Sequence, residues 1–365
     1  MFTISTKTAK YTEVADWLRK NILDGTFEPG VKLIGEYSLC EKFSISRHTA
    51  RSAIDVLEKE GLVIRKQGSG TYVSLDLYAQ YKNIGVLLTY AYDYTFSDMI
   101  SGIDKILSHK GHRITLMLTQ NKIEVERNRL LSLLASNIDG LIVEAVKSAL
   151  ASPNLDIYKD FAARNIPVVF VNTYHPKLNC NYIINNDEEG GRIATEYLID
   201  QGHRKIGGIF KHDSIQGGLR YKGFVNKLYE QNLKLDENNI IWYSEESLNN
   251  LFLDEQLPIL AKSLSSCTAV LCYSDRVAHK LIEASSKLGL NIPGDLSIAS
   301  FDNSYLSRLS TPAITTITHP GEEMGELAAE SLLKIIDKPN HKIHYTYQPT
   351  LVIRESVKKI FGITT

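Results

Sequence analysis

The strongest constraint on the fold is a series of short apolar runs that alternate with helical stretches. The runs cover residues 83–90, 114–118, 138–144, 166–172, 205–210, 268–273 and 295–301. Continuous apolar strands separated by helices are typical of parallel sheets that are buried on both faces. Residues 83–365 are also long enough for two such sheets. We therefore predict an α/β fold with two doubly wound lobes in this part of the chain.

The first 75 residues have a different pattern, with three helices followed by two short strands. Apolar residues at helical spacing predict a first helix that ends near Gly25. A short second helix opens at Glu36, and Ser46 is a suitable N-cap for the third. The segment LVIRKQGSGTYV is typical of a strand, a turn at residues 67–70 and a second strand. Together these elements predict a winged helix-turn-helix.

The placement of charge in this segment favours DNA as the partner. Arg47 and Arg51 are four residues apart and share one face of the third helix, with His48 beside them. Arginine makes bidentate hydrogen bonds to guanine in the major groove, where such helices approach bases with their N-terminal part. A glycine tip with Arg65 and Lys66 nearby suits the minor groove and its phosphates. A small helical domain with solvated charges explains single residues but not the whole array.

Residues 44–73, SISRHTARSAIDVLEKEGLVIRKQGSGTYV, resemble the DNA-binding head of GntR-type bacterial regulators. The shared marks are the SR-T-R pattern, the EGL turn and the QG-GT-V wing, and the resemblance covers about residues 8–75. One departure is Ile34-Gly35, where the family has proline followed by a hydroxyl residue. The hydroxyl N-cap of the second helix is thus replaced by glycine, which is a weaker cap. The resemblance implies DNA contacts by Lys10, Tyr11, Glu36, Ser46, Arg47, His48, Thr49, Arg51, Arg65, Lys66, Gln67 and Gly68.

Polar and aromatic residues gather where the predicted strands of the larger part end. Ligands of open α/β sheets bind beyond the carboxyl ends of the strands. Carboxylates, amides and arginine bond to hydroxyl groups, and aromatic rings cover apolar C–H faces, so this set predicts a sugar site. Asp187 fits a helix cap better than a ligand contact. The candidate sugar contacts are Tyr90, Tyr92, Asp93, Tyr94, Phe96, Glu144, Asn172, Lys211, Gln216, Arg220, Asp275 and Asp302.

Several of these segments resemble the effector domain of LacI/GalR repressors. The resemblance spans about residues 83–355 and is carried by IDGLIVE, GGLRYKGF, AVLCYSDRVAHKLIEASSKLGLNIPGDLSIASFDNS and LSTPAITTITHP. It implies a two-lobed, periplasmic-binding-protein-like fold in which Glu144, Arg220, Asp275 and Asp302 contact the sugar. Two departures are Ser274-Asp275, where relatives have Asn-Asp, and the lack of an evident hinge-helix sequence.

The fusion of the two parts resembles the arabinose-responsive repressors of Gram-positive bacteria. That resemblance implies L-arabinose as the effector, with another pentose, a hexose or a sugar phosphate as the alternative. It also implies a homodimer on palindromic, double-stranded operator DNA. We expect a DNA-binding domain at residues 1–75, a linker at 76–82, and a sugar-binding and dimerisation domain at 83–365.

Other classes of protein fit the sequence less well. No apolar run reaches the ~18 residues of a membrane span, and the N-terminus lacks an apolar signal core, so we expect a cytoplasmic protein without a membrane partner. The four cysteines form no CxxC pair, and we expect neither a metal nor a cofactor. An enzyme is the main rival, but GxSxG, HExxH and P-loop motifs are missing. A carrier protein would not need the DNA-binding head.

Overall fold

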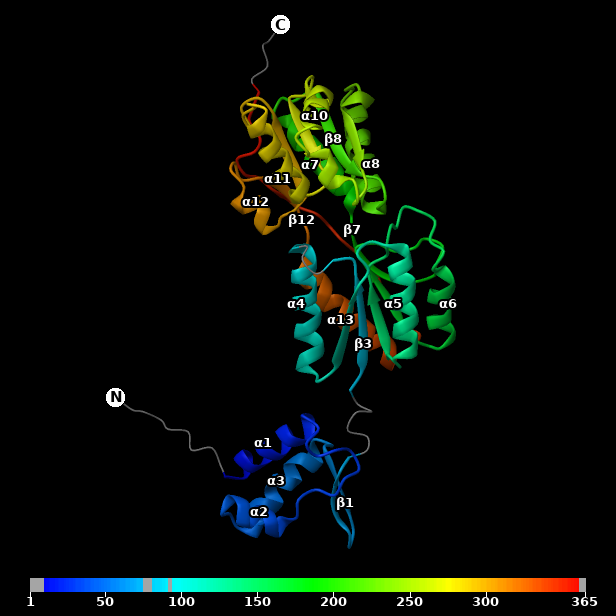
Figure 1. Ribbon diagram of the computed structural model, residues 1–365, viewed down its shortest axis with the longest axis vertical. Coiled ribbons are helices and arrows are strands. Elements are labelled where there is room, and N and C mark those ends of the chain that lie inside the picture. Colours follow the sequence, from blue (N-terminus) through cyan, green and yellow to red (C-terminus); the bar gives the residue numbers. More distant parts are fainter. Residues whose placement is uncertain (1–9, 75–80, 91–93, 361–365) are drawn as a thin grey trace, which may run out of the picture. The chain divides into compact units, whose positions relative to one another are not determined.

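The computed structural model describes residues 10–74, 81–90 and 94–360, without the side chains of residues 94–96. The chain divides into two compact units, residues 1–82 and residues 83–365 (Figure 1). Among the described helices, none combines the length and the apolar character that crossing a membrane requires.

The smaller unit is the predicted three-helix domain with a β-hairpin. Ser46 caps the third helix, because its hydroxyl accepts a hydrogen bond from the Thr49 amide at 3.2 Å. Gly35 caps the second helix without a side-chain bond, and that helix forms nonetheless. Leu18, Leu39 and other buried aliphatic residues of all three helices fill the core. The elements are α1 (Lys10–Leu23), α2 (Glu36–Phe43), α3 (Arg47–Lys59), β1 (Val63–Lys66) and β2 (Gly70–Val73).

The first lobe of the larger unit is a six-stranded parallel sheet with helices on both faces. Its strand order is β13-β7-β6-β5-β3-β4. Helices α4 and α13 pack on one face, and α5 and α6 cover the other (Figure 1). The strands are β3 (Asn83–Leu88), β4 (Arg113–Leu118), β5 (Gly140–Val143), β6 (Val168–Val171), β7 (Asn181–Asn185) and β13 (His344–Tyr347). The helices are α4 (Tyr94–His109), α5 (Ile123–Ala135), α6 (Leu155–Ala163) and α13 (Gly321–Asp337).

The second lobe repeats this architecture with the strand order β14-β12-β11-β10-β8-β9. Only β14 runs antiparallel to its neighbour among these described strands. Helices α7 and α8 cover one face, and α10 and α11 cover the other. The strands are β8 (Ile206–Lys211), β9 (Ile240–Tyr243), β10 (Ala269–Cys272), β11 (Ser297–Asp302), β12 (Thr315–Thr318) and β14 (Leu351–Val352). The helices are α7 (Asp187–Asp200), α8 (Ile215–Glu230), α9 (Leu248–Leu251), α10 (Leu257–Leu264), α11 (Asp275–Lys287) and α12 (Tyr305–Leu309), with a 3₁₀ turn at Glu237–Asn239.

The chain crosses between the two lobes three times, after β7, after β12 and after β13. The crossings are hydrogen-bonded to one another. The Asn186 amide donates to the Tyr347 carbonyl at 2.9 Å, and the Thr350 amide donates to Thr318 Oγ1 at 3.0 Å. Short, adjacent crossings of this kind allow two lobes to move as rigid bodies about a common hinge.

The seven predicted apolar runs correspond to β3, β4, β5, β6, β8, β10 and β11, so the predicted fold class is confirmed. In each sheet these strands are neighbours, and their carboxyl ends face the boundary between the lobes.

Candidate functional site

The N-terminal end of α3 is exposed, as a DNA-reading helix requires. Arg47 and His48 are exposed in its first turn. The Arg51 side chain is 63% exposed, and its Nε and Nη2 each donate to a carboxylate oxygen of Glu36 at 3.1 Å. This hydrogen-bonded pair lowers the pKa of Glu36, because Arg51 stabilises the ionised carboxylate. Glu36, the first residue of α2, therefore holds the Arg51 guanidinium in place on the exposed surface.

The hairpin carries a second exposed group of candidate DNA contacts. Lys66, Gln67 and Gly68 are exposed at the turn, where Gly68 has a φ of +75° that favours glycine. Arg65 instead turns back to α3, where Nη1 donates to Glu58 at 3.0 Å. A contact of Arg65 with phosphate would thus require it to leave this ion pair. Lys10 and Tyr11 are exposed in the first turn of α1.

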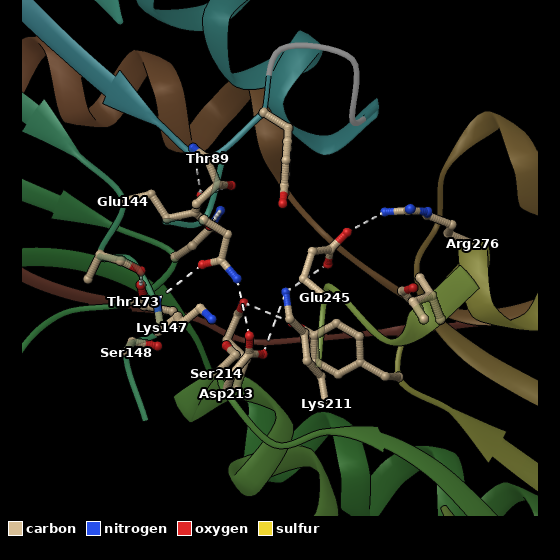
Figure 2. Close-up of a pocket in the computed structure, with 18 of the residues that line it drawn as sticks. Thr89, Glu144, Lys147, Ser148, Thr173, Lys211, Asp213, Ser214, Glu245 and Arg276 are labelled. Carbon is tan, nitrogen blue, oxygen red and sulfur yellow. Dashed lines mark hydrogen bonds and ion pairs between the residues drawn. The ribbon is translucent and has the colours of Figure 1, made fainter. Parts of the chain in front are cut away.

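A cavity lies between the lobes at the carboxyl ends of both sheets (Figure 2). It has about 90 Å³ of space open to water, several times the ~10–15 Å³ that one water molecule needs. It thus has room for a small polar ligand. Its lining residues are Thr89, Tyr90, Asn121, Glu144, Ala145, Lys147, Ser148, Asn172, Thr173, Lys211, Asp213, Ser214, Gln216, Arg220, Tyr243, Glu245, Leu248, Tyr273, Ser274, Arg276, Asp302 and His319.

The structure brings seven of the candidate sugar contacts together on the wall of this cavity, that is, among its lining residues. Four others, Tyr92, Asp93 and the side chains of Tyr94 and Phe96, lie outside the described residues. Tyr90 also packs partly into the core of its lobe, and its hydroxyl donates to the Gln120 carbonyl at 3.2 Å. The seven wall residues are Tyr90, Glu144, Asn172, Lys211, Gln216, Arg220 and Asp302.

Asp275 is not on the wall, which corrects the expectation that it contacts the sugar. It is fully buried at the start of α11, where Oδ2 accepts hydrogen bonds from the Ser304 amide at 2.7 Å and hydroxyl at 2.8 Å. The Ser300 hydroxyl donates to its other oxygen. Ser274 lines the cavity in its place and caps α11. Asp275 thus joins α11 to the end of β11.

On the first lobe, a chain of hydrogen bonds runs along the wall from His319 to Glu144. His319 Nε2 donates to Asn172 Oδ1 at 2.8 Å, and Asn172 Nδ2 donates to Glu144 Oε1 at 3.3 Å. Burial, with Arg220 nearby, lowers the pKa of His319 to about 3, so the imidazole is neutral. Thr89 Oγ1 donates to Glu144 Oε2 at 2.6 Å. Because His319 lies in the crossing after β12, this chain connects the wall to the hinge.

A group of ion pairs forms the other side of the cavity (Figure 2). Glu245 accepts from Lys211 at 3.0 Å and from Arg276 at 2.8 Å. Burial raises the pKa of Glu245, but these two cations outweigh burial and leave the pKa below its ordinary value. Lys147 of the first lobe donates to Glu246 of the second at 2.7 Å and therefore joins the two lobes.

Arg220 contacts two carboxylates and an aromatic ring at the buried end of the cavity. Its Nε donates to Asp187 at 2.8 Å, Nη1 lies 3.6 Å from Asp302, and the guanidinium lies 4.3 Å from the centre of the Phe301 ring. Burial alone would lower the pKa of Arg220, but the nearby carboxylates raise it above its ordinary value. Asp187 is therefore the partner of Arg220 and not the expected helix cap, which Asn186 supplies through a 3.2 Å bond from the Glu189 amide.

Asp213 is the clearest candidate for direct contact with a ligand. It is 1% exposed and lines the cavity, yet Oδ1 has no hydrogen-bond partner among the described residues. Lys211 Nζ lies 3.9 Å from Oδ1, an ion pair that is too long to be a hydrogen bond. A buried acceptor without a hydrogen bond is costly, and a hydroxyl from a ligand would supply one. Its Oδ2 accepts from Asn121 of the first lobe at 3.2 Å. Asn121, Ser148, Glu245 and His319 were not predicted, because loops and crossings without an apolar signal carry them.

Comparisons with known proteins agree with this division of the chain. Residues 10–73 match the family described as bacterial regulatory proteins of the gntR family, and residues 195–357 match the periplasmic binding protein-like domain. The arabinose metabolism transcriptional repressor of Halalkalibacterium halodurans is 36% identical over 95% of this chain and 96% of its own. The repressor of the same name from Geobacillus stearothermophilus is 34% identical over 96% and 98%.

Among solved structures, a LacI-type regulator from Alkaliphilus metalliredigens in complex with D-xylulofuranose is 27% identical. It covers 76% of this chain and 99% of its own, with a TM-score of 0.65. The regulator CcpA of Lactococcus lactis, at 24% identity over 76% of this chain and 100% of its own, has a TM-score of 0.66 and shares the fold.

The fold and the two sites define a DNA-binding transcriptional repressor with a GntR-type head and a LacI-type domain that senses a small molecule. The chain belongs to the family of the arabinose metabolism transcriptional repressors. Its relatives are regulators, and the chain is therefore a regulator rather than an enzyme.

Proposed function

We propose that L-arabinose binds the cavity between the lobes and releases the protein from its operator. The proposal rests on the pairing of basic side chains with carboxylates around the cavity. Each Lys and Arg that lines the cavity lies within 4 Å of a carboxylate: Lys147 with Glu246, Lys211 and Arg276 with Glu245, and Arg220 with Asp187. Such a wall favours a neutral, hydroxyl-rich ligand over a sugar phosphate, because a phosphate would meet cations that are already paired.

Three similar proteins support the choice of a pentose. The curated relatives that match nearly the whole chain are named for arabinose metabolism, and the regulator from Alkaliphilus metalliredigens was solved with a five-carbon sugar. Another pentose is the alternative, since a change of one or two wall residues alters which hydroxyl groups are satisfied.

Thermal unfolding with a panel of sugars tests the identity of the ligand. At about 100 times its dissociation constant, a ligand stabilises the unit that binds it by roughly 2.7 kcal/mol. We expect L-arabinose to raise the unfolding temperature of the larger unit, and D-glucose and D-ribose 5-phosphate to leave it unchanged. A shift with the phosphate but not with L-arabinose would refute the neutral-ligand proposal.

For the DNA-binding head, we propose that the N-terminal turn of α3 reads bases and that the hairpin tip enters the minor groove. The exposed Arg47, His48 and Arg51 support the first part, and the exposed Lys66 and Gly68 support the second. Two heads of a homodimer would place these groups on the two halves of a palindromic operator. We place residues 1–75 as the DNA-binding domain and 76–82 as the linker, and we infer that the protein acts in the cytoplasm, where its operator lies.

Release of DNA requires that the sugar bind one arrangement of the lobes better than another. Contacts from both lobes meet at the cavity. Asn121 bonds Asp213 at 3.2 Å, and Ser148 Oγ accepts from the Ile215 amide at 3.0 Å. A sugar between them would favour the closed arrangement, reached by movement of the lobes about the three crossings, and the first lobe, which begins at Asn83, would pass that movement to the head.

His319→Leu tests the connection between wall and hinge. The change removes the donor to Asn172 and leaves a buried acceptor unsatisfied, so we expect the larger unit to lose about 1–3 kcal/mol of unfolding free energy. We also expect L-arabinose to release operator less completely. The control is His319→Gln, whose amide keeps an N–H donor. Equal stability and equal release in the two variants would contradict the role of the hydrogen bond.

Glu144 predicts a pH dependence of stability. Burial raises its pKa from 4.5 to about 7, against the opposing bonds from Thr89 and Asn172. The folded state therefore holds the proton more tightly than the unfolded state, and this contribution to stability is lost as pH rises from about 4.5 to 7. At 1.36 kcal/mol per unit, the loss is about 3 kcal/mol. Unfolding free energies of Glu144→Gln at pH 5 and pH 8 should lack this part of the pH dependence. A difference as large as in the unchanged protein would contradict the assignment.

A further inference from the structure

A second cavity lies in the first lobe, at the amino-terminal ends of β5, β6 and β7 and thus at the opposite edge of the sheet from the proposed sugar site. Its volume is about 660 Å³, within the ~300–1,000 Å³ of ligand pockets. Its wall comes from the end of α6, the loops before β6 and β7, and the segment between α13 and β13.

This cavity is lined by basic side chains without carboxylate partners among the described residues, whereas the basic side chains at the proposed sugar site are paired with carboxylates. Four basic side chains line it: Lys159, Arg164, Lys177 and Lys342. In the described part of the chain, no carboxylate lies within 4 Å of their charged nitrogens, and the structure gives Arg164 only a bond to the Leu134 carbonyl at 3.2 Å. His341 adds an imidazole to the same rim. Unpaired cations around a hollow surface attract an anion.

The one carboxylate among the described residues that line this cavity, Asp139, accepts a hydrogen bond from the backbone. Asp139 Oδ2 accepts a hydrogen bond from the Asn83 amide at 2.7 Å. Asn83 is the first residue of β3 and of the larger unit, so this bond anchors the point where the chain enters that unit. A ligand in the cavity would therefore lie next to this anchor.

Apolar side chains line the cavity beside the basic ones. Ile166, Val168, Ile335 and Ile336 line it, together with the edges of Tyr158 and Phe170, whose side chains are otherwise buried. Apolar surface beside basic side chains fits a molecule with a flat ring and an anionic group, because the ring covers apolar surface and the anion meets Lys and Arg.

We propose that this cavity is a second ligand site, which takes a small organic anion that carries a ring. The site is separate from the sugar cavity and shares no lining residue with it. A ligand at this site would be a second effector of the repressor, bound next to the hydrogen bond between Asn83 and Asp139.

The test uses the full chain and the probe 8-anilinonaphthalene-1-sulfonate, which joins aromatic rings to a sulfonate. We expect saturable binding of one probe per chain by fluorescence. We expect Lys177→Glu combined with Lys342→Glu to weaken it at least about tenfold, because two of the four basic side chains that line the cavity are reversed in charge. The neutral analogue N-phenyl-1-naphthylamine should bind more weakly than the sulfonate.

The matched control is Lys110→Glu combined with Lys122→Glu. These lysines are exposed on the same lobe and outside the cavity, and the pair changes the net charge equally. Weaker binding in the first pair alone supports the site. Equal effects in both pairs, no effect in either, or binding that ignores the sulfonate would each overturn it. Unfolding of each variant in far-UV circular dichroism establishes that the fold is intact.

Discussion

Replacing Arg220 by alanine is expected to destabilise the larger unit by about 3–5 kcal/mol, the cost of removing one partner of a buried ion pair. The Arg220 side chain is almost fully buried between Asp187 and Asp302. Its loss leaves both carboxylates in a poorly solvated site. Chemical denaturation of the full chain, with a probe in the larger unit such as Trp242, measures the change. The variant should also fail to respond to L-arabinose, while operator binding by the head remains intact.

A double variant separates the ion pair from the packing of Arg220. Adding Asp187→Asn to Arg220→Ala removes one of the two carboxylates that are otherwise left uncompensated, so the double variant should recover part of the lost stability. If Asp187→Asn adds a further loss to Arg220→Ala instead, the two residues are not coupled, and the described role of Arg220 is wrong.

Replacing Arg51 by alanine is expected to weaken operator binding by about 1–3 kcal/mol, the cost of one bidentate contact with a base. The side chain is exposed, and Glu36 holds its guanidinium in place. Binding is measured by fluorescence anisotropy at fixed salt, because phosphate contacts make affinity depend on salt.

Arg51→Lys is the matched control, since it keeps the charge but not the planar fork. If Arg51 reads a base, lysine should bind operator almost as poorly as alanine, and the preference for operator over unrelated DNA should fall. If Arg51 only contacts phosphate, lysine should restore most of the affinity. If Arg51→Ala binds operator with unchanged affinity, the proposal that α3 reads bases is contradicted.

Most strands that the sequence predicted have continuous apolar runs because both of their faces are buried, whereas β4 at the edge of its sheet is partly exposed. Two of the strands that it missed, β12 and β13, carry a different signal. β12 is TTIT, whose threonines are buried through hydrogen bonds, such as that from the Arg354 amide to Thr315 Oγ1 at 3.0 Å. β13 is HYTY at the edge of its sheet and is largely exposed. Neither pattern differs from that of a polar loop until its neighbours are known.

The candidate site shows the same limit. Glu144 and Asp302 were predicted because they end apolar strands, and strand ends converge in a parallel sheet. Asp275 follows a strand too, but it opens α11 and turns inward to Ser300 and Ser304. The reverse holds for His319 and Glu245, which reach the cavity from segments without a strand pattern. Position along the chain located the edge of the sheet, whereas the direction of each side chain depends on local hydrogen bonds.

The affinity of the full chain for its operator, with and without L-arabinose, tests the central claim most directly. The operator is a duplex that the protein itself selects from random sequences. We expect saturating L-arabinose to weaken binding at least about tenfold, or about 1.4 kcal/mol, and we expect no such change in Asp302→Asn, which alters the proposed sugar site but not the head. Operator binding that L-arabinose leaves unchanged would contradict the account.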